Sequence, residues 1–408
     1  MPRDSEGPIF WLTAASAAAS LISIAAMETL LAAALFLWLL SYVAALCWPS
    51  SFSKPVPLRW PSYFLPLGIF FLATLTSLLM SPDPSAGRHA MQKVVLVSMG
   101  LVAAAFVTTE DRAAKAYKLL LAVTAVSAII AIVQFIQAEV TFLKTGNLAD
   151  DPTLLNRVSG TLGHWLTFSG VQLLVWCAAI PATVFLGRKW IAAIVTSGIA
   201  IILSNTRGAW LGAAAGFAFV AWALPRRVIL TVLICLIAVG AAASPFIYRR
   251  IAMSLDMSLA TNYSRLAYLS AGTRMIQDHP LFGVGPERIH QEFPRFYDGK
   301  QQLDTFYYGH LHNNFLQIAA ERGLLTLAAF LWFLVDLYRS LLRFLTESED
   351  TTRWAILGSL AALTGFVVAG ITEYNFGDSE VLVLLLFLVS IPFGLSSHVQ
   401  KDPHRESR

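Results

Sequence analysis

The stretch from Glu380 to Ser396, EVLVLLLFLVSIPFGLS, decides the fold class of this protein. Its only charged residue is the first, and apolar residues fill most of the rest. A helix needs about 17 to 25 such residues to cross the apolar core of a bilayer. Runs of comparable length recur along the chain, so about twelve transmembrane helices are predicted in total. The other eleven lie at about 8–26, 28–48, 62–80, 93–109, 118–137, 165–187, 190–206, 208–225, 228–248, 323–342 and 354–372.

The composition also indicates a membrane protein. Of the 408 residues, 56% are hydrophobic and 13% are charged, whereas about a quarter of the residues in a soluble domain are charged. With a mean hydropathy of +0.63, these values predict an all-α, polytopic protein in which residues 1–408 form one integral membrane domain. Cys47, Cys177 and Cys235 lie in or beside apolar runs without ligand spacing, which argues against a disulfide framework or a zinc site.

The basic residues predict the orientation in the membrane rather than affinity for nucleic acid. Cytoplasmic loops carry an excess of Lys and Arg, and the short loops follow this rule when both termini are cytoplasmic. The first span is expected to be retained, because no convincing cleavage site follows the mixed charges of residues 1–10. The outer face then receives the loops 138–164 and 249–322 and the acidic turn 373–378. The inner side receives Lys54, Arg59, Arg112, Lys115, Lys118, Arg188, Lys189, Arg226, Arg227, Arg339, Arg343, Arg353 and the basic tail.

The outer loop 249–322 holds eight Lys and Arg residues, against the usual bias, which predicts an anionic ligand. Helical spacing places Arg265 and Tyr268 on one face of a helix that ends before Pro280. The segment Gly283-Val284-Gly285 is interpreted as a structural turn, since no strand precedes it and no GxxxxGK follows. Three further arginines are either solvated or bind the ligand: Arg274, Arg288 and Arg295.

Two more arginines lie at the outer ends of apolar runs. Arg207 follows the polar run Ser204-Asn205-Thr206 and precedes Gly208, which is expected to permit a tight bend. Its side chain is either an interfacial anchor that reaches the lipid headgroups or a cation that faces a ligand, and the polar run favours the second interpretation. Arg157 belongs to a loop segment that also carries His164. That segment either packs under the large loop or contributes to the same pocket.

The segment Tyr308-Gly309-His310-Leu311-His312-Asn313-Asn314-Phe315 places two histidines and two asparagines at the mouth of an apolar helix. Ionisable groups at the membrane edge are functional-site candidates. His312 is expected at a helix N-terminus, where the helix dipole favours the neutral imidazole that a general base requires. The alternatives are a capping or interfacial histidine, or a metal site of His310 and His312. No third ligand lies at a supporting spacing, so no metal is predicted.

Three groups of residues resemble the O-antigen ligase family of bacterial envelope enzymes. This family belongs to a superfamily that also includes O-antigen polymerases and O-linked oligosaccharyltransferases. The resemblance covers about residues 150–325. It rests on Thr206-Arg207-Gly208-Ala209-Trp210, on Arg265 ahead of Met275-Ile276-Gln277-Asp278-His279-Pro280-Leu281-Phe282-Gly283-Val284-Gly285, and on His310-Leu311-His312-Asn313-Asn314-Phe315 with Glu321-Arg322-Gly323.

The resemblance implies a glycosyltransferase with a multi-span helical fold of the GT-C type in the bacterial inner membrane. Such an enzyme transfers O-antigen glycan from undecaprenyl pyrophosphate to a lipid A-core sugar on the periplasmic side, and completes lipopolysaccharide without nucleotide, metal or other cofactor. By position, Arg207 and Arg265 correspond to the essential arginines of the family and His312 to its proposed base. The family's frequent Trp after the second arginine is replaced here by Tyr268 or Leu269.

The residue types suit this chemistry. A lipid pyrophosphate is a good leaving group, and fixed arginines can stabilise the charge that develops on it. A base on the opposite face of the sugar predicts inversion at the anomeric carbon. We therefore expect His312, Arg265 and Arg207 to be catalytic. The residues expected to bind substrate are Arg157, His310, Asn313, Tyr268 and Arg288.

Three alternatives share parts of this pattern. An O-antigen polymerase would use the same donor with a second lipid-linked glycan as acceptor. An O-linked oligosaccharyltransferase is disfavoured because only a short tail follows the last apolar run. A lipid-glycan transporter would bind headgroups through the arginines, but transporter sites lie near the midplane of the bilayer. The outer placement of Arg265 and His312 favours an enzyme.

Overall fold

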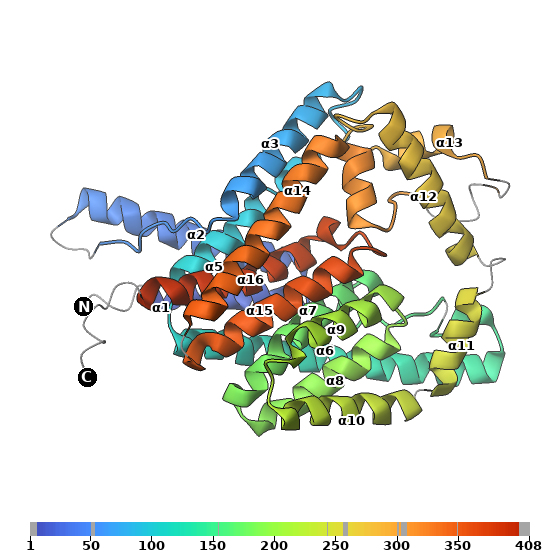
Figure 1. The fold of residues 1–408 in the computed structure, drawn as a ribbon, viewed down its shortest axis with the longest axis horizontal. Coiled ribbons are helices and arrows are strands. Elements are labelled where there is room, and N and C mark those ends of the chain that lie inside the picture. Colours follow the sequence, from blue (N-terminus) through green and yellow to red (C-terminus); the bar gives the residue numbers. More distant parts are fainter. Residues whose placement is uncertain are drawn as a thin grey trace.

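The protein is helical wherever the structure describes it, with no strand in that part of the chain (Figure 1). This computed structural model describes residues 6–49, 54–153, 155–242, 244–255, 260–299, 302, 308–348 and 350–399. The α-helices of these residues are α1 (Glu6–Ala19), α2 (Ile24–Cys47), α3 (Phe64–Met80), α4 (Arg88–Gln92), α5 (Ser98–Phe106), α6 (Glu110–Thr145), α7 (Trp165–Leu186), α8 (Ile191–Leu203), α9 (Arg207–Ala221), α10 (Arg226–Ala242), α11 (Ser244–Leu255), α12 (Ala260–Asp278), α13 (Ile289–Phe296), α14 (Asn314–Glu347), α15 (Asp350–Ala369) and α16 (Ser379–Val399).

The helices confirm the predicted class of an all-α, polytopic membrane protein. Every predicted apolar run coincides with at least part of a helix. Within the described residues, seven helical segments are long and apolar enough to cross a membrane, and the number twelve stays a prediction. The seven are Ile24–Cys47, Arg88–Phe106, Glu110–Thr145, Trp165–Thr183, Asn314–Glu347, Thr351–Ala369 and Ser379–Ser396, and shorter apolar helices span Gly7–Ala19, Phe64–Met80 and Ile191–Leu203.

Several helix boundaries differ from the predicted ones, because capping residues rather than apolar content end a helix. The first two helices are separated by the residues between Ala19 and Ile24, and not at Met27-Glu28. Ser23 caps the second helix, since its side chain accepts a hydrogen bond from the backbone N–H of Ala26. Helix α6 is far longer than the predicted run 118–137, since it starts after Thr109 and ends at Gly146, which has a left-handed φ of 63°. The predicted run 228–248 includes the start of a separate helix, α11.

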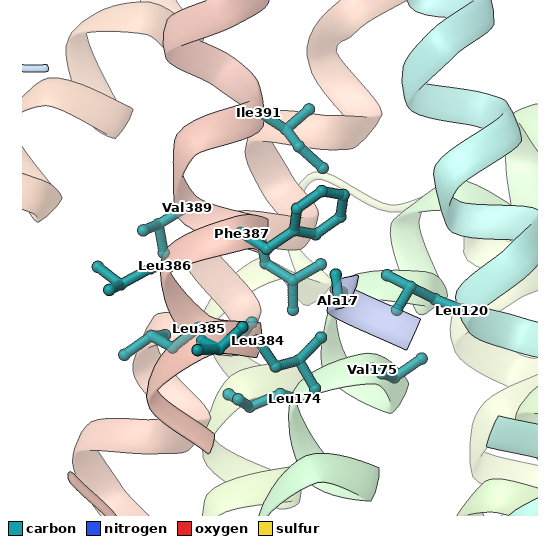
Figure 2. Packing of buried hydrophobic residues seen from close by; sticks show 14 of the residues in the cluster. Ala17, Leu120, Leu174, Val175, Leu384, Leu385, Leu386, Phe387, Val389 and Ile391 are labelled. Carbon is teal, nitrogen blue, oxygen red and sulfur yellow. The ribbon is translucent and has the colours of Figure 1, made fainter. Parts of the chain in front are cut away.

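Helix α16, which contains the stretch from Glu380 to Ser396, lies at the centre of the packed core. Its side chains from Val381 to Val389 are at most 2% exposed. They pack against α1, α5, α7 and α15. Figure 2 shows members of this core from several helices, among them Ala17 of α1 and Val175 of α7. A helix that is apolar on all sides, as this one is, has to be enclosed by others or by lipid.

Glycines bring α9 into direct contact with α15. A Cβ added to Gly212 or Gly216 would lie 2.5 Å from the carbonyl oxygen of Gly365 or Ala361, respectively. At Gly208 it would lie 2.4 Å from Oγ1 of Thr372, just beyond α15. Small residues at four-residue spacing permit this close packing of membrane helices. The first residue of α9, Arg207, is therefore held beside the end of α15.

The tight turn between α8 and α9 corrects one prediction. The residue with the left-handed backbone is Asn205, with a φ of 53°, and not Gly208, which lies inside the first turn of α9. Asparagine tolerates this conformation because its short polar side chain makes local hydrogen bonds. The amide of Asn205 donates to the carbonyl oxygens of Leu203 and Pro152, at 3.0 and 3.3 Å. Gly208 serves the close approach to α15 instead.

A kink in α14 receives the turn that joins α12 to α13. At Gly323 the backbone is not helical, with a φ of 84° and a ψ of 169°. The carbonyl oxygen of Ala320 accepts the N–H of Val284 at 2.9 Å, and the N–H of Leu324 donates to Pro280 at 2.8 Å. A Cβ at position 323 would lie 2.0 Å from the carbonyl oxygen of Leu281. The glycine turn thus has the predicted structural role, and it fixes α12 against α14.

Candidate active site

The ends of four helices and one further helix, α12, meet around one buried carboxylate, that of Glu373. His164 is the N-cap of α7, Arg207 is the first residue of α9, and His312 directly precedes the N-cap of α14. Glu373 follows α15, and Arg265 lies on α12, which packs against α14. The site thus lies at one end of the helix bundle, where chain segments that are far apart in sequence converge.

Glu373 bridges a histidine and an arginine. Its Oε2 accepts a hydrogen bond from Nδ1 of His312 at 3.0 Å, and its Oε1 accepts one from the guanidinium of Arg265 at 3.1 Å. The guanidinium also donates to the carbonyl oxygen of Thr372 at 3.2 Å. Burial by itself would raise the pKa of Glu373, but the hydrogen bond and positive charge of His312, together with Arg265, lower it below its usual value. Glu373 is therefore an ionised carboxylate.

Backbone geometry fixes the direction of the His312 ring. This residue has a φ of 47°, which is uncommon for any residue other than glycine. Its ring stacks on the ring of Tyr268, with centroids 5.2 Å apart and planes at 25°. The preceding N–H, that of Leu311, donates to Oε1 of Gln317 at 2.7 Å. Unusual backbone held by its surroundings is typical of active sites. With Nδ1–H donating to the carboxylate, the lone pair of His312 lies on Nε2.

The two asparagines after His312 hold the loop that carries Glu373. Asn313 caps α14 through Oδ1, which accepts two backbone N–H groups at 2.9 Å, and its Nδ2 donates to the carbonyl oxygen of Ile371 at 2.8 Å. Asn314 donates from Nδ2 to Oδ1 of Asn375 at 2.6 Å and accepts the N–H of Phe376 at 3.0 Å. The pair explains how a loop after α15 is brought next to the histidine.

Three arginines interact electrostatically with the carboxylate, and Arg265 contacts it directly. Burial is the largest cause that lowers the pKa of Arg157, to about 10. The positive charges of Arg207 and Arg265 lower this pKa further, and the negative charge of Glu373 raises it. Arg157 therefore stays charged at neutral pH. Its guanidinium lies 5.3 Å from the ring centroid of Trp165, a distance at which cation–π attraction operates. Three guanidinium groups around one carboxylate leave a surplus of two positive charges.

Two further histidines lie near His312. The ring of His310 is 4.3 Å from that of His312, measured between centroids. Burial, followed by the charge of His312, lowers the pKa of His310 to about 3, so its imidazole is neutral at physiological pH. Burial and the charges of His312 and Arg157 also lower the pKa of His164. His164 stacks on Trp165 with ring centroids 4.3 Å apart.

The structure brings most of the predicted site residues together. Arg157, Arg207, Arg265, His310, His312 and Tyr268 all belong to the cluster around Glu373.

The structure places the other two predicted substrate-binding residues in structural contacts. Both polar atoms of the Asn313 amide are engaged in capping α14 and in holding the loop after α15. Arg288 lies elsewhere, buried beside α13, with its guanidinium donating to Glu292 at 2.5 Å and to Gln291 at 3.1 Å.

Glu373 is the site residue that sequence reasoning did not single out. From the sequence, the turn 373–378 is predicted only to be an acidic connection on the outer face. The available signal was an acidic residue directly at the outer end of an apolar run, where a carboxylate is costly unless it is paired. Among the residues that the structure describes, no group of three His, Cys, Asp or Glu side chains has the spacing for a metal ion.

Residues 192–331 match the family model described as O-antigen ligase. These residues make up about a third of the chain, and we refer to them as the O-antigen ligase domain after the family that they match. The domain runs from α8 into α14 and contains Arg207, Arg265 and His312. No curated protein is similar enough to the chain to count as a match. The predicted resemblance is thus confirmed, and the domain supports a membrane protein with glycosyl-transfer function of the O-antigen ligase or polymerase type. Glu373 and Arg157 reach the same cluster from outside the O-antigen ligase domain.

Proposed function

We propose that the protein is a metal-independent glycosyltransferase of the bacterial inner membrane. It transfers O-antigen glycan from undecaprenyl pyrophosphate to a sugar hydroxyl of the lipid A core, on the periplasmic side, and so completes lipopolysaccharide. The observation that carries this proposal is a histidine–carboxylate pair next to three arginines, two of them inside an O-antigen ligase domain.

The charge of the site supports a pyrophosphate donor. A pyrophosphate diester carries one negative charge on each phosphate, which matches the surplus of two positive charges around Glu373. Guanidinium groups bind phosphate oxygens through paired N–H donors and stay charged at any physiological pH. Arg207 and Arg265 are proposed to bind the pyrophosphate and to stabilise the charge that it gains as it leaves, with Arg157 as a third contact.

The reaction follows from the direction of His312. Its Nε2 removes the proton from the acceptor hydroxyl, and the oxygen attacks the anomeric carbon of the donor glycan. The bond from that carbon to the pyrophosphate oxygen breaks, and undecaprenyl pyrophosphate leaves with the electron pair. Attack from the face opposite the leaving group inverts the anomeric configuration. The proton on His312 is then returned to solvent.

The position of the site favours an enzyme over a transporter. Arg207, His312 and Glu373 lie at helix ends rather than halfway along the helices, whereas transporter sites lie near the midplane. By the positive-inside rule, both termini are proposed to be cytoplasmic and these helix ends to lie on the periplasmic side. The loop 249–322, which contains α12 and α13, is proposed to carry the active-site segments within a GT-C-like membrane domain.

The decisive test is transfer by the purified protein. Labelled undecaprenyl-pyrophosphate glycan and lipid A-core are incubated with the protein in the presence of a chelator. Label on lipid A-core is the expected result. Glycan chains that lengthen on the carrier lipid would instead identify a polymerase, and movement of lipid-linked glycan across proteoliposomes without a covalent product would identify a transporter.

A matched pair of histidine variants tests the base. His312→Ala is expected to lower kcat by about 10²–10⁴-fold, the usual contribution of a general base. His279→Ala is the control, because His279 is exposed at the end of α12 and contacts Phe296 rather than the cluster. Full transfer by a correctly folded His312→Ala protein would remove the base assignment.

A further inference from the structure

One carboxylate serves both halves of the proposed chemistry. Oε2 of Glu373 accepts a hydrogen bond from Nδ1–H of His312, the residue proposed to act on the acceptor sugar. Oε1 accepts a hydrogen bond from the guanidinium of Arg265, which is proposed to bind the pyrophosphate of the donor. The side chain is buried, and its low pKa keeps it charged. Removing a partner from a buried ion pair leaves an uncompensated charge, so this arrangement constrains all three side chains.

We propose that Glu373 is the positioning residue of this active site: it holds His312 in the tautomer with the lone pair on Nε2 and fixes Arg265 toward the pyrophosphate. The proposal rests on the proposed function and adds a residue that lies outside the O-antigen ligase domain. Glu373 also stabilises the imidazolium that forms when His312 takes the acceptor proton. A carboxylate behind a catalytic imidazole acts in this way without itself taking up a proton.

Glutamine at position 373 cannot satisfy both partners. If its carbonyl oxygen accepts Nδ1–H of His312, its NH₂ group faces the N–H donors of Arg265. If the oxygen accepts from Arg265 instead, the NH₂ group faces Nδ1 of His312, which then has to be the lone-pair atom. The second arrangement puts the proton on Nε2 and removes the base. Glu373→Gln has nearly the same size as the native side chain, so this effect is separate from a packing defect.

The test is a kinetic comparison in the transfer assay. Glu373→Gln is expected to lower kcat by about 10²–10⁴-fold and to change the donor KM by less than about threefold, because the loss affects the chemical step. In the His312→Ala background the same substitution is expected to lower kcat by no more than about threefold, since the two residues act as a unit. A kcat of Glu373→Gln within threefold of the wild type would overturn the proposal, as would multiplicative losses in the double variant.

A second variant covers the case in which Glu373→Gln does not fold. Glu373→Asp keeps the charge but withdraws the oxygens by one carbon–carbon bond, about 1.5 Å, which breaks a hydrogen bond of 3.0 Å. For Glu373→Asp we expect kcat to fall about tenfold while the donor KM stays unchanged. A kcat equal to that of the wild type would contradict the proposal.

The control is Asp378→Asn on the same turn. Asp378 is partly buried, and its carboxylate accepts a hydrogen bond from the hydroxyl of Thr167 at 3.1 Å, whereas Glu373 accepts from His312 and Arg265. The kcat of the Asp378→Asn variant is expected to stay within threefold of the wild-type value. If the wild-type protein shows no transfer at all, the proposed function is wrong. If the wild type transfers glycan and Glu373→Gln is equally active, only the positioning role of Glu373 is wrong.

Discussion

Substitution of Gly212 by alanine tests how the fold builds the site. The added Cβ would lie 2.5 Å from the carbonyl oxygen of Gly365, about 0.9 Å inside the 3.4 Å at which ordinary contact begins. A backbone oxygen inside a helix cannot rotate away, so α9 and α15 have to separate by about 1 Å. Because Arg207 starts α9 and Glu373 follows α15, this separation moves the arginine away from the carboxylate.

The expected size of the effect follows from that shift. Overpacking of this kind costs about 1–3 kcal/mol of stability. A displacement of about 1 Å at an active site can lower the rate about 10²-fold. Gly212→Ala should therefore unfold at a lower temperature in detergent and transfer glycan about 10²-fold more slowly than the wild type.

Gly68→Ala is the matched control. A Cβ at position 68, on the exposed face of α3, meets no atom within 4 Å. Alanine is favoured over glycine in a helix by up to about 1 kcal/mol, so this variant should be as stable as the wild type or more so, with normal transfer. Wild-type unfolding temperature and activity in Gly212→Ala would refute the argument that glycine contacts position the arginine.

Three further outcomes are expected. Arg265→Lys keeps the positive charge but loses the planar guanidinium that is proposed to bind both Glu373 and phosphate. In the transfer assay, kcat should fall by at least about tenfold. An unchanged rate would show that the charge alone suffices. Asn314→Ala removes the hydrogen bonds to Asn375 and Phe376, and should lower the free energy of unfolding by about 1–3 kcal/mol in a denaturant titration, with wild-type stability counting against this role. Folding lowers the pKa of His310 to about 3, so the unfolded chain binds a proton on this residue more readily than the folded protein does. The free energy of unfolding should therefore fall as the pH decreases from about 6.5 toward 3. His310→Gln should flatten this part of the stability–pH curve, and an unchanged curve would contradict the argument.

Much of the fold was predictable from the sequence because lipid allows few solutions. Backbone polar groups in a bilayer have to be paired within the segment, so an apolar run of sufficient length becomes a helix. The helix ends were less predictable, as Ser23 and Asn205 show. Caps and left-handed residues depend on single side chains that hydropathy averages out. The break of α14 at Gly323 depends on a turn about forty residues earlier in the chain.

The chemistry-bearing residues were also predictable in part. Arg207, Arg265 and His312 stood out because charged or ionisable groups at the membrane edge need a reason. Arg288 met the same criterion, yet the structure pairs it with Glu292 beside α13. A pattern of charges indicates that a ligand or a partner is needed, but it does not distinguish an ion pair within the protein from a substrate contact.

Hydropathy and residue chemistry suffice to establish the membrane class, the approximate position of the helices and the residue types of the site. Those properties are local, because hydropathy and chemistry belong to single residues or short runs. In contrast, the contacts by which Glu373 joins His312 to Arg265, and by which Asn313 and Asn314 hold its loop, arise only when the chain folds. These contacts join residues about sixty to one hundred positions apart, and they depend on glycine-mediated helix packing and a kinked α14.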